Sequence, residues 1–261
     1  MRESLKHLVE TLTMLVALAW LAVICLSWTV IALPLLLVLP QRPATRCGRL
    51  GILAGFRLYV WSLELLGAYR LDLAVLKELR GGPALVLAPN HPSLIDALFI
   101  IAHDPSVACV MKSSLMNNVF LGAGARLARY IPNDPPRRMI AAAIAELERG
   151  GVVLLFPEAT RTREAPVNPL KSSVGIIAKH AGVPVQTLLI EQDSACLSKG
   201  WSLFKRPSFP IGYRMRLGRR FEAPADVRTF TAELEAYFRA ELADSAQNRW
   251  IAERGHTTAA G

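Results

Sequence analysis

The run from Leu12 to Leu33 carries no formal charge, and this feature limits the possible folds of the chain most strongly. A second apolar stretch, Pro34 to Leu39, follows directly. As an α-helix, the first run would cover roughly 33 Å, about the thickness of the hydrocarbon core of a bilayer. The segment therefore predicts a helix embedded in or lying on a membrane. Pro34 is expected to kink or end the helix, so the sequence is compatible with a re-entrant hairpin and with a single tilted span.

A cleaved signal peptide is the competing interpretation, since Arg2 and Lys6 give the segment a basic start. The apolar part of a signal peptide runs about 7 to 15 residues and ends in small residues. Here the apolar stretch is longer and stops at Leu39-Pro40. A retained membrane segment is therefore favoured.

The formal net charge of +9 indicates an anionic partner. Arginines cluster beside the apolar run and at two later places, and these groups are Arg42, Arg46, Arg49 and Arg57, then Arg126, Arg129, Arg137 and Arg138, then Arg214, Arg216, Arg219 and Arg220. Basic residues next to a membrane segment favour the cytoplasmic side and anionic headgroups. Membrane lipids are the expected partner, at the inner (cytoplasmic) membrane, with the folded domain facing the cytoplasm. Any single arginine also fits an ordinary solvated face. No nucleic-acid-binding motif is recognisable.

The cysteines are far apart and lack C-x-x-C spacing; they are Cys25, Cys47, Cys109 and Cys196. This pattern predicts neither a disulfide framework nor a metal site. We expect small residues in apolar surroundings and a reducing compartment. No metal and no bound cofactor are expected.

Beyond Gly67, short β-favouring runs alternate with helical patterns, which predicts an α/β fold with a mostly parallel or mixed sheet flanked by helices. The expected strands are Tyr69 to Leu73, Ala84 to Ala88, Val107 to Met111, Val152 to Phe156, Val185 to Ile190 and Gly212 to Leu217. The expected helices are Ser93 to Ala102, Arg137 to Arg149, Ser172 to His180 and Thr229 to about Trp250, after an interfacial helix at Ala44 to Leu66. We divide the chain into membrane-associated helices (1–66), an α/β domain (67–226) and a C-terminal helix with a frayed tail (227–261).

His91 is the candidate general base. It follows the strand expected at Ala84 to Ala88, and ligands bind at the carboxyl ends of strands in open α/β sheets. Pro92 suits the first turn of a following helix. Asp96 can meet the imidazole if His91 lies outside that helix, fixing its tautomer and leaving the other ring nitrogen to take a proton. The competing interpretation is a helix-capping His91 with a merely solvated Asp96.

A second polar turn, Phe156-Pro157-Glu158-Ala159-Thr160-Arg161, follows the strand expected at Val152 to Phe156. It is expected at the same edge of the sheet as His91. Arg161 can bind a phosphate or carboxylate through a forked pair of hydrogen bonds. Glu158 is expected to hold substrate hydroxyls or to orient Arg161; the alternative is a structural ion pair between the two.

These motifs resemble those of the glycerolipid acyltransferase family, which includes bacterial 1-acylglycerol-3-phosphate acyltransferases. Asn90-His91 and Asp96 match N-H-x-x-x-x-D, and Phe156 to Arg161 matches F-P-E-G-T-R. Val183-Pro184-Val185 matches a late V-P-V motif, and Met111-Lys112 followed by Phe120-Leu121-Gly122 also fits. The resemblance covers roughly Gly67 to Leu217.

The resemblance implies transfer of an acyl group from acyl-CoA or acyl carrier protein to a hydroxyl of a lysophospholipid-like acceptor. The implied base is His91, oriented by Asp96. The expected substrate-binding residues are Glu158, Thr160, Arg161, Lys112, Asn133 and Arg137. A thiolate leaves easily, so no covalent enzyme intermediate is required, and the chain has no G-x-S-x-G elbow.

Two positions depart from the family pattern. Ala159 replaces a glycine, which costs roughly 1–2 kcal/mol if that residue is left-handed. Asn133, in Tyr130-Ile131-Pro132-Asn133, stands where the family places an arginine thought to meet the acceptor's phosphate. Either Arg129, Arg137 or Arg138 compensates, or the acceptor lacks a glycerol phosphate, as in aryl-polyene or polyketide-like lipids.

A hypothesis from another class is a catalytically silent, lipid-binding membrane protein in which Ala159 and Asn133 mark decay. The intact His91, Asp96 and Arg161 argue against it.

Overall fold

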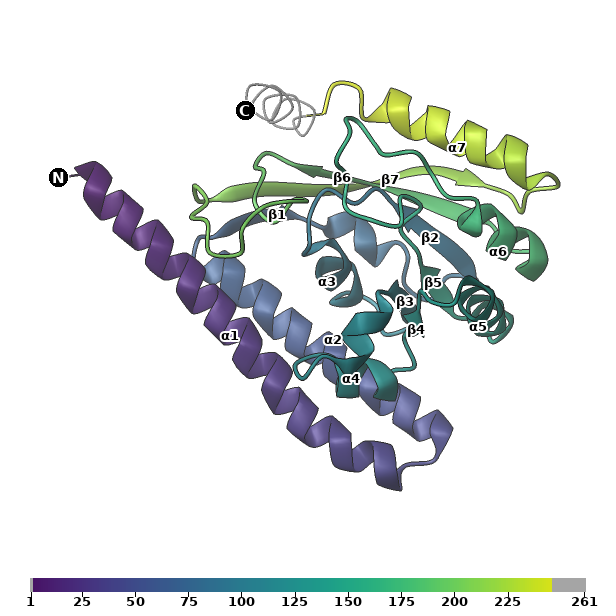
Figure 1. The fold of residues 1–261 in the computed structure, drawn as a ribbon, viewed down its shortest axis with the longest axis horizontal. Helices are drawn as coiled ribbons and strands as arrows, with labels where there is room; N and C mark the ends of the chain where they lie inside the picture. The colour runs from purple at the N-terminus through teal and green to yellow at the C-terminus, as the bar shows by residue number, and fades with distance from the viewer. Residues whose placement is uncertain (1, 246–261) are drawn as a thin grey trace.

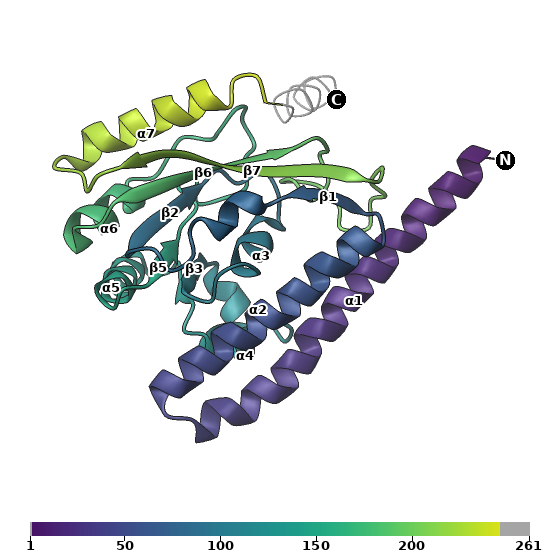
Figure 2. The ribbon, with the colours of Figure 1, turned by 180° about the vertical axis from the view of Figure 1, so that it is seen from behind.

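Two long helices open the chain, and a computed structural model describes residues 2–245. Helix α1 (Arg2–Val38) contains the whole uncharged run, and α2 (Gln41–Leu65) packs beside it. The two lie antiparallel along one side of the α/β domain (Figures 1 and 2). Helix α1 continues through Pro34 and ends at Val38, so Pro34 does not end it. By length and composition alone, α1 is the one helix within residues 2–245 able to cross a membrane.

Helix α2 packs closely against the α/β domain. Gly48 lies directly against the backbone of Ala128, where a β-carbon would clash. Buried side chains follow at Ile52, Tyr59 and Leu63, one helical face of α2. The helix expected over Ala44 to Leu66 is therefore present, and it forms part of the wall of the domain.

The centre of the molecule is a seven-stranded sheet in the order β1-β7-β6-β2-β5-β3-β4. Its strands are β1 (Tyr69–Asp72), β2 (Leu85–Pro89), β3 (Val107–Met111), β4 (Ile131–Pro132), β5 (Val152–Leu154), β6 (Val185–Gln192) and β7 (Ile211–Phe221). All neighbouring strands are parallel except β6 and β7. The predicted α/β fold with a mostly parallel or mixed sheet is confirmed.

Helices cover both faces of the sheet (Figure 1), because the central strands are apolar on both sides. In β2, Leu85 and Leu87 join the core that faces α2, whereas Val86 and Ala88 join the core on the opposite face. The helices and 3-10 turns of the domain are η1 (Ala74–Lys77), α3 (Asp96–Ile101), η2 (Ser113–Asn117), α4 (Gly122–Leu127), α5 (Pro136–Glu148), α6 (Ser173–Ala181) and α7 (Val227–Glu241). Three of these, α5, α6 and α7, contribute to the second core.

Some boundaries differ from the sequence prediction. Helix α3 begins at Asp96, whereas the prediction began at Ser93. Strand β4 was not predicted, since Ile131–Pro132 is too short to show the alternation of apolar and polar residues that marks a strand. Helix α7 ends at Glu241; the predicted extension to Trp250 lies partly outside the described residues, and the tail 254–261 lies wholly outside them. The division of the chain into three parts stays a prediction.

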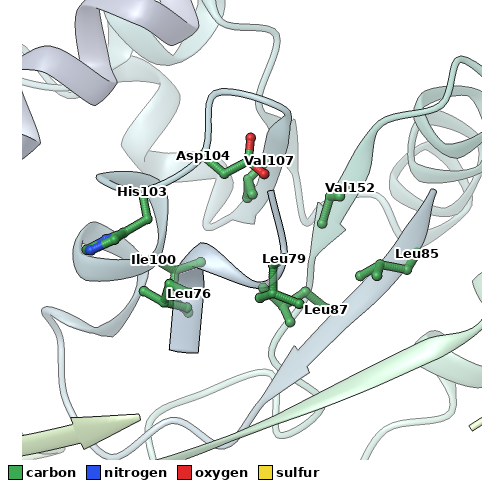
Figure 3. A pocket seen from close by; sticks show the side chains of 9 residues that line it. All are labelled: Leu76, Leu79, Leu85, Leu87, Ile100, His103, Asp104, Val107 and Val152. Carbon is green, nitrogen blue, oxygen red and sulfur yellow. The ribbon is translucent and has the colours of Figure 1, made fainter. Parts of the chain in front are cut away.

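The amino ends of the central strands leave almost no space. A cavity of about 10 Å³ lies there. Figure 3 shows the side chains that line it, among them Leu85, Val107 and Val152. That volume holds a single water at most. A substrate must therefore be sought at the opposite edge, where the same strands end.

Candidate active site

The two motif loops meet at the carboxyl edge of the sheet. Strands β2 and β5 are paired in parallel, with Leu87 opposite Leu154, so the loops that follow emerge side by side. The backbone N–H of Thr162 donates to the carbonyl oxygen of His91 over 2.7 Å. The predicted convergence of the two loops is thus present in the structure.

His91 and Asp96 are in direct contact. The Nδ1 of His91 lies 2.8 Å from Oδ2 of Asp96, which is fully buried, and the His91 side chain is 17% exposed. The imidazole stacks on Phe156, with ring centroids 3.9 Å apart. With Nδ1–H donating to the carboxylate, Nε2 is the nitrogen left to accept a proton.

Tyr213, on strand β7, is a third member of this group. Its hydroxyl donates to Oδ1 of Asp96 over 2.6 Å, and its ring packs edge-on against Phe99. Burial, and then the charge and the hydrogen bond of Asp96, raise the pKa of Tyr213 well above its ordinary value. Tyr213 therefore stays a donor, and both oxygens of Asp96 are fixed.

The loop from Asn90 to Ile95 is held by its neighbours. Buried Asn90 bonds the backbone of Ile190 through its amide nitrogen and oxygen, at 2.9 and 2.7 Å. The N–H of Ser93 donates to Oδ2 of Asp96 over 2.9 Å. These bonds let Asp96 turn back toward His91, and they explain why α3 begins at Asp96.

Glu158 forms hydrogen bonds within the protein that hold the loops of the site together. Its carboxylate is buried and accepts from the N–H of His91 (2.8 Å), the hydroxyl of Thr162 (2.8 Å) and the N–H of Asn168 (2.9 Å). Burial raises its pKa although these bonds oppose the shift. With both oxygens occupied, Glu158 has little capacity left for substrate hydroxyls, which argues against the predicted direct contact.

Arg161 does not pair with Glu158, so both the expected orienting role and the alternative ion pair are wrong. Its Nη1 donates to the carbonyl oxygens of Leu197 (2.7 Å) and Ser198 (2.9 Å), in the loop after β6. Burial lowers its pKa, opposed by the charge of Asp96. Lys199, in the same loop, donates to the hydroxyl of Thr160 over 3.2 Å. Arg161 and Thr160 are thus joined to a third loop that the sequence motifs do not include.

The other predicted substrate-binding residues lie further along the edge. Asn133 accepts from the N–H and the hydroxyl of Ser113, both at 3.0 Å, and so fixes the turn after Lys112. Asn133 and Arg137 follow β4, which β5 and β3 separate from β2. At about 4.8 Å per strand, they lie roughly 14 Å from the His91 strand. Their contact with substrate stays a prediction.

Ala159 occupies the left-handed region, with φ of 57°. Its N–H bonds the carbonyl oxygen of Phe156 at 3.0 Å, which closes the turn. A β-carbon is disfavoured in this conformation. The glycine expected from the family pattern is therefore one that this backbone would accommodate without strain.

Replacing Ala159 by glycine is expected to stabilise the protein by about 0.5–1 kcal/mol, because relief of left-handed strain outweighs the added freedom of the unfolded chain. The free energy of unfolding in detergent measures this effect. Ala54→Gly, at an exposed position inside α2, is the matched control and should destabilise by about 1 kcal/mol. A loss of stability in Ala159→Gly would contradict the strain argument.

A large apolar cavity lies beside the loop from Asn90 to Ile95. Its volume is about 340 Å³, and its wall is formed by α1, α2, α3, β3 and α4. Leu94 and Met111 line it, each close in sequence to a predicted site residue, His91 or Lys112. The cavity is thus apolar along its length and adjoins polar groups at the sheet edge.

Sequence analysis missed Tyr213 and the loop of Lys199, which come from distant segments, and Asn168, which lies ten residues after Glu158 in the segment between β5 and α6. Each belongs to no motif, and only the pairing of β6 with β2 and β7 brings two of them to the edge. No group of three or more His, Cys, Asp or Glu residues able to hold a metal occurs within residues 2–245.

Residues 72–191, a little under half of the chain, match the family described as Acyltransferase. The resemblance predicted from the motifs is confirmed.

Two relatives make the relationship more specific. The chain is 24% identical over 130 residues to the chloroplastic 1-acyl-sn-glycerol-3-phosphate acyltransferase BAT2 of Brassica napus, matching 48% of this chain and 38% of that protein. It is 23% identical over 154 residues to the 1-acyl-sn-glycerol-3-phosphate acyltransferase of Pseudomonas aeruginosa, matching 57% of this chain and 60% of that protein. The match covers less than two thirds of the length of either relative.

The fold is shared with the crystal structure of the 1-acyl-sn-glycerophosphate (LPA) acyltransferase PlsC from Thermotoga maritima. The TM-score is 0.68 at 17% identity, covering 94% of this chain and 97% of that one. The shared architecture includes nearly the whole chain, whereas the family match covers only the central α/β part.

Proposed function

We propose that this protein transfers an acyl group from a thioester, carried on CoA or acyl carrier protein, to a hydroxyl of a lysophospholipid-like acceptor. The observation that carries the proposal is the chain of contacts from Tyr213 through Asp96 to His91, which leaves Nε2 as a base. The acyltransferase-family match over residues 72–191 supports the reaction type.

In the proposed reaction, Nε2 of His91 removes the proton of the acceptor hydroxyl as its oxygen attacks the thioester carbonyl. Collapse of the tetrahedral intermediate breaks the carbon–sulfur bond. The leaving thiolate then takes the proton that His91 removed from the hydroxyl, and a free thiol departs. Asp96 stabilises the imidazolium between these steps. An ester and a free thiol are formed, and no cofactor or covalent enzyme intermediate is needed.

We further propose that the 340 Å³ cavity holds an acyl chain. Its apolar wall suits a hydrocarbon, since burial gains about 0.8 kcal/mol per methylene. Trp28 from α1 and Phe56 from α2 contribute to this wall. Placing the chain there would bring the thioester toward Leu94 and hence toward His91.

The apolar helix and the relationship to a bacterial acyltransferase indicate membrane association. We propose that α1 and α2 lie together in the cytoplasmic leaflet of the inner membrane. Helix α1 packs against both α2 and α4, so it runs along the domain. Its outer face exposes large apolar side chains such as Leu15, Val23 and Ile31. This arrangement favours a helix pair held in one leaflet over an isolated span.

Purified full-length protein in mixed micelles tests the proposed function. Acyl-CoA and acyl carrier protein thioesters of equal chain length are offered with 1-acylglycerol 3-phosphate, and free thiol and diacyl product are quantified together. We expect the two products in equal amounts. Thiol release without ester would indicate only a thioesterase, and no release from any thioester would refute the proposal.

Tyr213→Phe is expected to lower kcat about 10-fold or more, since a hydrogen bond to a charged group contributes about 1.5–3 kcal/mol. The acceptor KM should not change, because Tyr213 acts as a positioning residue through Asp96.

Tyr237→Phe is the control for this variant. Its hydroxyl accepts from the N–H of Arg219 over 2.8 Å, and its ring joins the core on the other face of the sheet. It should lose stability with no change in kcat. If both variants behaved alike, the contribution of Tyr213 would be structural.

A further inference from the structure

The loop between β6 and β7 carries two exposed apolar side chains at its tip. Phe204 is 72% exposed and Leu203 is 45% exposed. The N–H of Lys205 donates to the carbonyl oxygen of Ser202 over 2.9 Å, which closes a turn with Leu203 and Phe204 at its apex. Turn positions usually hold Gly, Asn, Asp, Ser or Pro. A leucine and a phenylalanine at this place therefore put apolar surface where a loop is normally polar.

The loop is fastened to helix α1. Arg206, two residues after the apex, forms an ion pair with Glu10, a buried carboxylate in the amino-terminal part of α1. Leu203 lines a cavity of about 40 Å³ together with Met14 and Leu18 of α1. Figures 1 and 2 show the loop beside this half of the helix. The tip of the loop is thus held at the flank of α1.

The exposed face of α1 adjoins the loop. Leu8, Leu12 and Leu15 recur at helical spacing on one side of α1, and all three are exposed. Leu15 follows Met14 and lies nearly one turn before Leu18, and both of these line the cavity beneath the loop. The apolar face of α1 and the apex of the loop are therefore neighbours. Larger exposed apolar surfaces of this kind mark sites of contact with a protein or a membrane.

The side chains around the apex are those favoured at a bilayer interface. Nζ of Lys205 lies 4.5 Å from the centre of the Trp201 ring. Tryptophan is enriched at the level of the lipid headgroups. A lysine beside it can rest its apolar stem on the ring while its ammonium group meets anionic headgroups. This combination of Trp, Leu, Phe and Lys favours a lipid surface over a protein partner.

We propose that Leu203 and Phe204 enter the same leaflet as α1, so that the loop between β6 and β7 forms a second membrane contact. The inference rests on the membrane placement proposed for α1, and it does not depend on the reaction. The same loop accepts hydrogen bonds from Arg161 at Leu197 and Ser198. Its insertion would therefore hold the edge of the sheet that carries the candidate site against the bilayer.

Site-specific labelling of the full chain tests the contact. Cys47 is the exposed cysteine, whereas Cys25, Cys109 and Cys196 are buried, so Cys47→Ser gives a background for labelling single introduced thiols. The protein is placed in nanodiscs of phosphatidylethanolamine and phosphatidylglycerol. An environment-sensitive fluorophore is attached at Phe204→Cys, and its quenching by nitroxide lipids and by aqueous iodide is measured.

The label at Phe204→Cys should shift its emission to the blue, lose most of its intensity to nitroxide lipids and resist iodide. A nitroxide near the headgroup should quench it more than one at the end of the acyl chain, since an interfacial segment enters only about 5–10 Å. Ala236→Cys, exposed on α7 at the opposite face of the sheet, is the control and should show iodide quenching alone. Strong iodide quenching and no lipid quenching at Phe204→Cys would overturn the contact. Protection from both quenchers would indicate a protein partner, such as a second copy, and would also overturn it.

A label at Leu15→Cys separates this inference from the proposed placement of α1. If the nitroxide lipids quench Leu15→Cys but not Phe204→Cys, α1 is in the membrane and the loop contact fails. If they quench only Phe204→Cys, the loop contact stands and the placement of α1 fails.

A further variant shows whether the native side chain, and not the fluorophore, causes insertion. With the label at Leu203→Cys, Phe204→Asp should reduce lipid quenching and increase iodide quenching, whereas Phe204→Trp should leave both unchanged. Equal quenching in the Asp and Trp variants would show that Phe204 contributes nothing to the contact, which contradicts the proposal.

Discussion

His91→Ala should lower the rate of acyl transfer about 10²- to 10⁴-fold, because it removes the base that takes the acceptor proton. The contact between Nδ1 and Asp96 at 2.8 Å prepares the imidazole for this step, and the stacked ring of Phe156 keeps it in one orientation. Turnover is measured by the release of free thiol and the formation of ester. The KM of the thioester should change little, since its acyl chain is expected in the apolar cavity.

Added imidazole tests whether the group lost in His91→Ala is a base. If the missing group is a base, imidazole should restore part of the rate in a concentration-dependent way. His180→Ala is the control; His180 is exposed on α6 and bonds only the backbone of Ile176 among described contacts. It should retain full activity and show no response to imidazole. Undiminished turnover in His91→Ala would refute the assigned mechanism.

Asp96→Asn completes the test. The amide has one acceptor oxygen, yet the buried carboxylate now serves His91, Ser93 and Tyr213. At least one of these donors would lose its partner, and the imidazolium would lose its counter-charge. We expect a large fall in kcat, with rescue by imidazole absent, since His91 itself remains.

Much of the fold was predictable because its strands are short apolar runs between turn residues. Val107 to Met111 was predicted with its observed bounds, and the other long strands differ by a few residues at their ends. Helix α3 was predicted too long at its start, because the N–H of Leu94 and the hydroxyl of Ser93 donate to the carbonyl oxygens of Leu197 and Cys196, which holds these two residues in a turn. A signal that comes from about a hundred residues away cannot be found in a local pattern.

The difference between local patterns and contacts from distant segments also applies to the site. His91 with Asp96, and Arg161 with Thr160, could be predicted because each pair lies within one loop. Tyr213 and Lys199 are brought in by the order of the strands, which periodicity does not determine. Glu158 was expected to hold substrate hydroxyls or to orient Arg161, whereas it is buried and accepts hydrogen bonds from His91, Thr162 and Asn168.

Arg49→Met is expected to destabilise the protein by about 3–5 kcal/mol, the usual cost of removing one partner from a buried ion pair. Nη1 of Arg49, in α2, lies 2.8 Å from Oε1 of Glu146, and both side chains are 10% exposed. Nε of Arg49 also donates to the carbonyl oxygen of Ala128 over 3.1 Å. The side chain thus fastens α2 to the α/β domain. Unfolding in detergent, followed by circular dichroism, measures the loss.

The pH dependence of stability should change as well. Burial alone would raise the pKa of Glu146, but the hydrogen bonds and charges of Arg49 and Arg149 lower it. A carboxyl group with a lowered folded-state pKa stabilises the protein above its unfolded value, about 4.3, and loses that contribution as pH falls through the folded value. In Arg49→Met, the loss of stability as pH falls should be smaller than in the wild type. Arg46→Met, exposed on the same helix, should match wild type at every pH.

A double variant separates the ion pair from the packing of the α2 helix. If the charge left on Glu146 causes most of the loss, Arg49→Met combined with Glu146→Met should be more stable than Arg49→Met alone, since no unpaired buried charge remains. If the lost bond to Ala128 dominates, the second substitution should lower stability further. The sign of this difference shows whether α2 is held mainly by the ion pair or by the close packing around Gly48.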